Sequence, residues 1–310
     1  MSDFKYLFGP VPSRRFGLSL GVDLVPRKTC TLDCIFCEVG PTTDRTLVRK
    51  EYVPVAEVLK ELADWFALNR KADFITVTGS GEPTLHTRFG DVLSAIRSHE
   101  RVRSALLTNS TLLHLPEVRA GAALADVVKV SLSAWDQASF AAITRPADGV
   151  DFLRMVEGLR MFRQDFSGEL WMEVFIVPGL NDLPAQVAAI AALARTIRPD
   201  RVQLNTAVRP TARQNVPALA ESQLRSLAEI FTPAAEVIAR FAPGGATAGA
   251  RHADKSAVLA MLARRPCTVG DVAHAFALSR EEAGTMIREL LGQCAVRSEV
   301  RNGENYYSVV

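Results

Sequence analysis

Short apolar runs alternate with longer stretches of helical periodicity over residues 1–241. The apolar runs are rich in β-branched residues and predict strands over Leu18–Val25, Phe74–Thr78, Ala105–Thr108, Val127–Ser133, Leu170–Val177 and Arg201–Thr206. Helices are predicted over Val55–Asn69, Phe89–Ser98, Gln137–Ile143, Val150–Phe162, Leu183–Ile197 and Glu221–Phe231, with Ala235–Phe241 as a further strand or helix. Strands that alternate with helices imply βαβ units, so we expect an α/β fold, a partial (βα)6 TIM-like barrel of parallel strands.

Polar or glycine-containing loops follow these predicted strands. They are the cysteine loop (residues 30–37), residues 79–84, Thr108-Asn109, Ser131–Ser133, residues 178–182 and Asn205. Because active sites of such barrels lie at the carboxyl ends of the strands, these loops should face one cavity. Residues 8–15 are rich in Gly and Pro and are predicted as a loop. The loop ends in Arg14 and Arg15, which are either solvated charges or donors to a substrate carboxylate or phosphate.

The pattern changes after residue 241. Residues 242–254 are mostly small and predict a linker, which divides the chain into domains over 1–241 and 255–310. Helices are predicted over Lys255–Arg264, Val269–Ala277 and Ser279–Leu291, followed by a hairpin over residues 294–309 around Asn302-Gly303. Three helices and a hairpin predict a small winged-helix (α+β) domain.

The charges do not favour DNA binding. The whole chain has a net charge of +2, and residues 255–310 hold seven Lys or Arg against six Asp or Glu. The helix predicted to enter a groove contains two arginines and three glutamates, which phosphates would repel. We therefore expect no specific duplex DNA binding. The module should pack on the barrel or present a substrate or partner, and Arg297 and Arg301 leave a weak RNA contact open.

Cys30, Cys34 and Cys37 have the spacing C-x3-C-x2-C. Thiolates are the soft ligands that hold iron–sulfur clusters, and a [4Fe–4S] cluster normally takes four of them. Three ligands would leave one iron open, as in a catalytic rather than a closed structural site. The alternatives are a zinc knuckle that lacks a ligand, or three core thiols. Cys267 and Cys294 lie far away and are expected to be small buried residues.

This spacing, with Phe36 directly before the last cysteine, resembles the signature loop of the radical S-adenosylmethionine (SAM) enzymes. The resemblance implies that the open iron chelates SAM. An electron from the cluster then cleaves SAM to methionine and a 5′-deoxyadenosyl radical, which removes hydrogen from a substrate. It also implies a reductant such as flavodoxin or ferredoxin. The chain shows neither a signal peptide nor an apolar run of membrane-span length, so we expect a cytoplasmic protein without membrane contact.

Ser80-Gly81-Glu82-Pro83 resembles the same family's "GGEP" motif, which contacts the SAM amino group, with Ser80 in place of the first glycine. Without that context, a Gly-Glu-Pro turn would be a structural feature. The resemblance extends to weaker SAM-binding candidates, which are otherwise ordinary strand caps or Asx turns: Asn109, Ser131, Ser133 and Val177. Gln203 and Asn205 face either substrate or a polar layer. No motif supports a substrate role for Lys129.

The opening Gly-Pro-Val-Pro-Ser-Arg-Arg and the cysteine loop most resemble the branch related to tRNA wyosine-synthase enzymes. The first hypothesis is therefore a radical SAM enzyme that acts on a nucleic-acid base, a peptide or a small metabolite. The second is an iron–sulfur redox sensor that reports to DNA through the winged helix. A third is an activase of a glycyl radical enzyme. The Gly-Ser-Gly-Glu-Pro loop favours the first over the second, because a sensor needs no SAM contacts.

Overall fold

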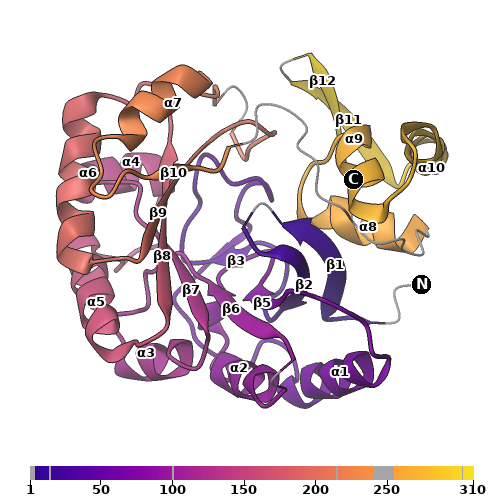
Figure 1. Cartoon of the computed structure of the whole chain (residues 1–310), viewed down its shortest axis with the longest axis horizontal. Helices are drawn as coiled ribbons and strands as arrows, with labels where there is room; N and C mark the ends of the chain where they lie inside the picture. Colours follow the sequence, from indigo (N-terminus) through magenta and orange to yellow (C-terminus); the bar gives the residue numbers. More distant parts are fainter. Residues whose placement is uncertain (1–3, 14, 100, 214–215, 240–254, 302) are drawn as a thin grey trace.

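One eight-stranded sheet organises the chain, in the order β1-β2-β5-β6-β7-β8-β9-β10 (Figure 1). The computed structural model describes residues 4–13, 15–99, 101–213, 216–239, 255–301 and 303–310. The strands of this sheet are β1 Leu7–Ser13, β2 Gly17–Asp23, β5 Phe74–Thr78, β6 Arg103–Leu107, β7 Val127–Ser131, β8 Glu169–Ile176, β9 Arg201–Thr206 and β10 Glu236–Val237.

Neighbouring strands from β2 to β10 are parallel, and β1 joins β2 antiparallel. Each parallel strand lies beside the next one in the chain, and β1 and β10 form the two edges of the sheet. The sheet is therefore a curved, partly open barrel. The predicted α/β class and all six predicted strands are confirmed, with ends that differ by one or two residues.

Helices connect the strands and cover the outside of the sheet (Figure 1). They are α1 Val55–Ala67, α2 Phe89–Arg97, α3 Pro116–Ala122, α4 Gln137–Thr144, α5 Phe152–Asp165, α6 Pro184–Ile197 and α7 Glu221–Ala228. The face of α1 that packs on the sheet buries Val58, Leu62 and Trp65. The sequence analysis missed α3, because seven residues are too few to show a clear period.

The prediction of a loop over residues 8–15 is wrong for most of that segment. Leu7–Ser13 is strand β1, and its register with β2 shifts between Phe8 and Val11. The Gly9-Pro10 bond lies within this irregularity. Proline lacks an N–H donor, so a strand tolerates it at a bulge or an edge, and β1 supplies both.

The inside of the barrel is layered, as the alternating side chains of β8 illustrate. Trp171 stacks on Phe16 at 5.1 Å between ring centroids, near the amino ends of the parallel strands. Phe175 stacks on Phe36 of the cysteine loop at 4.1 Å, near the carboxyl ends. Because side chains on one strand face repeat every two residues, Glu173 lies between these aromatic layers. The barrel thus has an aromatic floor, a polar middle and a mouth beside the cysteine loop.

Residues 255–310 form three helices and a two-stranded antiparallel sheet, apart from residue 302, which is not described. Their bounds are α8 Lys255–Arg264, α9 Val269–Phe276, α10 Arg280–Gly292, β11 Val296–Arg301 and β12 Glu304–Val309. These elements agree with the predicted ones. They enclose a separate apolar core, which includes Val258, Phe276 and Ile287. The predicted linker 242–254 lies outside the described residues.

This C-terminal segment contacts the edge strand β1 and the chain that follows β9. Val11 of β1 packs against its apolar core. The β11–β12 hairpin reaches the segment that follows β9: Tyr306 Oη donates to the Val208 carbonyl oxygen at 3.0 Å, and Arg301 Nη2 donates to the Ala207 carbonyl oxygen at 3.2 Å. The expectation that this segment packs against the barrel is confirmed.

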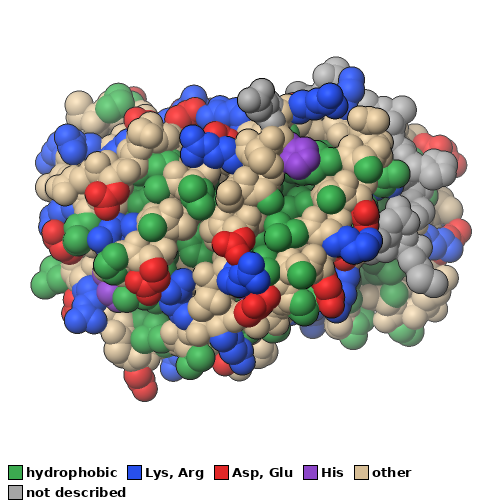
Figure 2. Space-filling view, turned by 90° about the horizontal axis from the view of Figure 1, so that it is seen from below, with side chains coloured by type: hydrophobic (Ala, Val, Ile, Leu, Met, Phe, Trp, Pro, Cys, Tyr) green, Lys and Arg blue, Asp and Glu red, His purple; other side chains and the backbone are tan. Residues whose placement is uncertain are grey.

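The exterior carries charges of both signs. On the face drawn in Figure 2, Lys and Arg side chains are interspersed with Asp and Glu. Within the part of the chain that the structure describes, no helix is long and apolar enough to cross a membrane.

Candidate functional site

The cysteine loop lies at the mouth of the barrel, directly after β2. Its first cysteine belongs to the short strand β3, Thr29–Cys30, which pairs with β4, Asp44–Arg45. Two side chains donate to its sulfurs. Lys28 Nζ lies 3.1 Å from Cys37 Sγ, and Asn109 Nδ2 lies 3.4 Å from Cys30 Sγ. The Cys37 amide donates to the Cys34 carbonyl oxygen at 3.2 Å, which turns the loop back on itself.

The three thiols share one poorly hydrated environment. Burial, with a further contribution from the nearby Glu82, raises the pKa of Cys30 to about 12. Burial also raises the pKa of Cys34 well above its usual value, with further contributions from Cys30 and Cys37. The thiols therefore lie close enough to interact. A metal centre binds thiolates and offsets the cost of burying their charge, so this donor set fits an iron–sulfur cluster. The described residues include no group of three or more His, Cys, Asp or Glu placed to hold a single metal ion.

The Gly-Ser-Gly-Glu loop after β5 packs directly on this segment. The Glu82 amide donates to the Thr29 carbonyl oxygen at 3.1 Å, and the Lys28 amide donates to the Ser80 carbonyl oxygen at 2.9 Å. A Cβ on Gly81 would lie 1.9 Å from the Thr29 carbonyl oxygen, so only glycine permits this approach. Ser80 Oγ donates to Asp23 Oδ2 at 2.9 Å, which ties the loop to the end of β2.

Glu82 has a structural task. Its buried carboxylate accepts from the Thr84 amide and hydroxyl at 3.1 and 2.6 Å. It also accepts from the Thr108 hydroxyl and the Asn109 amide, both at 2.7 Å. Burial raises the Glu82 pKa, although these hydrogen bonds act in the opposite direction. Glu82 thus joins the loops after β5 and β6, while Pro83 begins the 3-10 turn Pro83–Leu85.

The other predicted SAM-binding residues line the same mouth. Phe36 and Val177 belong to one apolar cluster with Phe175. Ser133 Oγ accepts from the Phe175 amide at 2.9 Å. Ser131 Oγ is 3.4 Å from Lys129 Nζ. The hydrogen bonds of these two serines within the protein do not test their predicted role toward a ligand.

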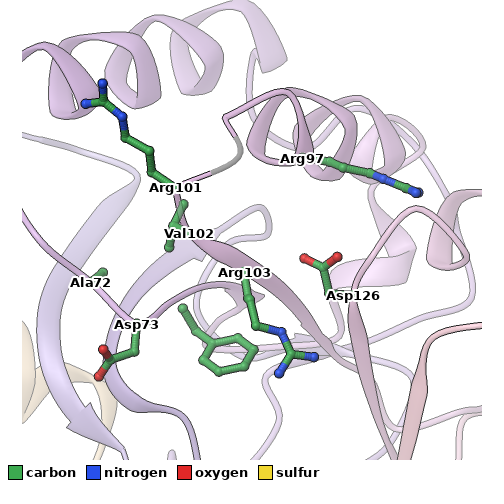
Figure 3. A pocket seen from close by; sticks show the side chains of 8 residues that line it. Ala72, Asp73, Arg97, Arg101, Val102, Arg103 and Asp126 are labelled. Atoms are coloured by element: carbon green, nitrogen blue, oxygen red, sulfur yellow. The ribbon is translucent and has the colours of Figure 1, made fainter.

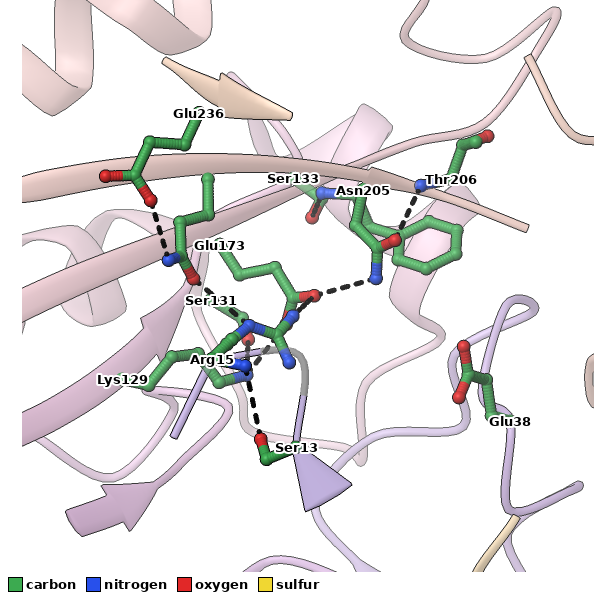
Figure 4. Close-up of polar contacts among 12 residues, drawn as sticks. Ser13, Arg15, Glu38, Lys129, Ser131, Ser133, Glu173, Asn205, Thr206 and Glu236 are labelled. Atoms are coloured by element: carbon green, nitrogen blue, oxygen red, sulfur yellow. Dashed lines mark hydrogen bonds and ion pairs between the residues drawn. The ribbon is translucent and has the colours of Figure 1, made fainter. Parts of the chain in front are cut away.

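A charged polar layer lies below this mouth (Figure 4). Glu173 pairs with Arg15 Nη2 and accepts from Lys129 Nζ at 2.8 Å and Asn205 Nδ2 at 3.0 Å. Arg15 Nε donates to Gln203 Oε1 at 3.1 Å. Burial would raise the Glu173 pKa, but the two cations outweigh it and hold that pKa well below its usual range.

The structure brings three of the candidate substrate residues, Arg15, Gln203 and Asn205, into one polar layer, whereas Arg14 lies outside the described residues. Sequence reasoning missed Glu173 altogether and found no motif for Lys129. Glu173 does carry a signal, because it is an acidic residue with apolar neighbours on both sides in the middle of strand β8. Such a residue on the inner face of a barrel strand needs a buried partner.

A second missed contact joins the cysteine loop to the C-terminal segment. Arg209 is buried and pairs with Glu38 at 3.3 Å and with Asp271 of α9 at 3.7 Å. Burial would lower the Arg209 pKa, but the two carboxylates outweigh burial and raise it. Glu38 directly follows Cys37 in the chain, so Arg209 connects this end of the loop with α9.

The two remaining cysteines differ from one another. Cys267 is buried as expected, whereas Cys294 is exposed, so the prediction of burial is wrong for Cys294. Cys294 has a φ of 54° in the short connection between α10 and β11, which lies at the surface.

A surface groove of about 480 Å³ lies at the opposite end of the barrel, around the amino ends of β5 and β6 (Figure 3). Its carboxylates serve the fold: Asp73 Oδ2 accepts from the Leu18 amide, and Asp126 Oδ2 from the Ser104 amide, both at 2.7 Å. Its polar groups hold strand ends in place, and it lies far along the strands from the cysteine loop. We therefore place the functional site at the mouth.

A partly open parallel α/β barrel with a three-cysteine loop at its mouth defines the class of protein. The sequence profile described as Radical SAM superfamily matches residues 24–191, more than half of the chain. The chain belongs to this superfamily.

The chain also has curated relatives, and its fold resembles a solved structure. The chain is similar to a UPF0026 protein of Helicobacter pylori strain 26695, at 36% identity over 230 residues, 73% of each protein. It is also similar to a Brachyspira hyodysenteriae protein named GTPase Obg, at 33% identity over 98% of this chain, but it spans only 45% of that protein. In fold it resembles Streptococcus suis SuiB bound to SAM, with a TM-score of 0.54, 16% identity, and coverage of 71% of this chain and 50% of that one.

Proposed function

We propose that this protein is a radical SAM enzyme whose cluster is held by Cys30, Cys34 and Cys37. The observation that carries this proposal is the three-cysteine loop at the mouth of a barrel from this superfamily, with Lys28 and Asn109 donating to its sulfurs. When bound, the cluster supplies the electron that cleaves SAM to methionine and a 5′-deoxyadenosyl radical, which takes hydrogen from the substrate. The reductant would be a flavodoxin or ferredoxin.

The surrounding side chains would stabilise the thiolates. Lys28 lies 3.1 Å from Cys37 Sγ as a buried cation, and Asn109 donates to Cys30 Sγ. Charge-assisted hydrogen bonds to an anionic sulfur are stronger in a poorly hydrated site than in water. Both residues would therefore favour the thiolate form that binds iron.

The loop of residues 80–83 would receive the methionine end of SAM through its backbone. The four donors to Glu82 already occupy its carboxylate, so Glu82 would shape the loop rather than grip the ligand. The apolar cluster around Phe36 and Val177 supports an adenine site, and Ser131 and Ser133 lie on neighbouring parts of the mouth. Water exclusion by this apolar wall would protect the radical.

The substrate stays open among a nucleic-acid base, a peptide and a small metabolite. The wyosine-synthase branch remains a prediction from the opening motif. We also propose that residues 1–241 and 255–310 are two domains and that the second is a winged helix. Arg301 and Tyr306 of its hairpin contact the barrel, which supports a role in completing the enzyme rather than in reading DNA.

The direct test is SAM cleavage by reconstituted protein with dithionite. We expect wild type to form 5′-deoxyadenosine, and Cys34→Ala to lose both cluster iron and product. Cys294→Ala is the matched control, because its exposed thiol lies far from the loop. A reducible, fully loaded cluster that never cleaves SAM would point instead to the redox-sensing regulator. Full iron in Cys34→Ala would refute the ligand assignment.

A further inference from the structure

The polar layer below the mouth has more positive than negative charge. Two cations, Arg15 and Lys129, share the single carboxylate of Glu173 (Figure 4). The other two carboxylates drawn in Figure 4 are paired with other cations: Glu236 with Arg201 at 3.4 Å, and Glu38 with Arg209 at 3.3 Å. Among the described residues, the layer therefore carries one unmatched positive charge.

Such a cluster is costly as a purely structural feature. Moving charges out of water carries a penalty that pairing offsets only in part, and apolar side chains could fill the same space. The barrel already has an aromatic floor beneath this layer, where Phe16 stacks on Trp171. The charges are thus not needed to close the barrel.

The layer is also within reach of the mouth. Glu173 and Gln203 lie three residues before the ends of β8 and β9, about 10 Å along each strand. The side chains of Arg15, Lys129 and Glu173 keep 12%, 10% and 13% of their surface exposed, so the layer is not sealed. Arg15 Nη1 has no acceptor among the described residues, and a guanidinium can donate five hydrogen bonds.

We propose that Arg15 and Lys129 bind an oxyanion of the substrate, a carboxylate or a phosphate group. Gln203 and Glu173 would fix the orientation of the guanidinium, as the bonds to its Nε and Nη2 atoms indicate. This inference rests on the proposed function, because it places the anionic end of the substrate below the radical-forming mouth. Glu173 acts as an internal competitor for the same cations, so its charge would tune the affinity for the anion.

The test is a titration of reconstituted, SAM-loaded enzyme, cluster oxidised, with inorganic phosphate and with ¹³C-acetate at constant ionic strength. Binding is followed by ³¹P and ¹³C line widths. We expect saturable binding that weakens at least tenfold in Lys129→Met. It should strengthen about threefold in Glu173→Gln, because the competing charge is removed. If Lys129 and Glu173 only stabilised the fold, there would be no reason for one variant to weaken anion binding and the other to strengthen it.

Arg101→Met is the control, because Arg101 lines the groove at the other end of the barrel and should leave binding unchanged. Saturation by phosphate alone identifies a phosphate-bearing substrate, and saturation by acetate alone a carboxylate. Equal binding in all variants, loss only in Arg101→Met, or no saturable binding of either anion would overturn the inference. No SAM cleavage is needed for this readout, so a failure of anion binding can be told apart from a failure of SAM cleavage.

Discussion

Gly81 is the residue whose replacement the site tolerates least. A Cβ at this position would lie 1.9 Å from the Thr29 carbonyl oxygen and 2.9 Å from Val25 Cγ2. Backbone cannot move away as a flexible side chain can, so the loop after β5 would have to leave the cysteine loop. That approach is what places residues 80–83 next to the predicted cluster ligands.

We predict that Gly81→Ala destabilises the protein by about 1–3 kcal/mol, as overpacking does, and weakens SAM binding at least tenfold. Gly292→Ala is the matched control, because a Cβ on Gly292 would meet nothing within 4 Å in helix α10. The Gly292→Ala variant should be as stable as wild type or more stable by up to about 1 kcal/mol. Chemical denaturation and SAM titration give the two values, and equal behaviour of the variants would refute the close approach.

At the residue scale, the sequence predicted the parts of the site whose residues are close together in the chain. Cys30, Cys34 and Cys37 lie within eight residues, and the glycine-glutamate turn is four residues long, so their patterns are visible in one window. Glu173 meets Arg15 across 158 positions of the chain. Nothing local predicts such a pair, because it exists only when the turn between β1 and β2 meets strand β8 inside the barrel.

At the scale of elements, strongly periodic segments were predicted and irregular ones were not. β1 was missed because Gly9 and Pro10 break its pattern, although an edge strand accepts both. The helix α3 was missed because it has seven residues. Six of the seven parallel strands, β2 and β5 to β9, were found because each contains apolar residues and is followed by a distinctive loop, whereas for β10 the prediction left a strand or a helix open.

Arg209 is the contact that joins two elements far apart in sequence, the cysteine loop and α9. We predict that Arg209→Met lowers the free energy of unfolding by about 3 kcal/mol, because the substitution leaves Glu38 and Asp271 without their shared cation. Hydrogen exchange should then rise in Val269–Phe276 and around residue 38.

The control for that variant is Arg225→Met, which breaks an exposed ion pair with Glu221 within α7. Exposed ion pairs of this kind contribute at most about 0.5 kcal/mol to the stability of the fold, so hydrogen exchange should stay unchanged in Arg225→Met. If both variants behave alike, Arg209 does not couple α9 to the loop.

At the scale of the whole molecule, the C-terminal segment completes the barrel surface. It packs on β1 through Val11, and its hairpin donates to backbone carbonyls after β9. The elements of this segment were predictable from their own patterns. Packing on the barrel was one of the expected outcomes, but the contacts that produce it were not predicted, since they depend on Tyr306, Arg301 and Arg209, which are ordinary polar residues in the sequence.

The most direct test of the central claim is electron paramagnetic resonance of the reduced, reconstituted protein before and after SAM is added. An iron with no protein ligand should bind SAM and change the spectrum of the cluster, at one SAM per cluster. We expect this change in wild type and in Cys267→Ala. A fully loaded cluster whose spectrum stays the same at saturating SAM would contradict the account of an open, SAM-binding iron.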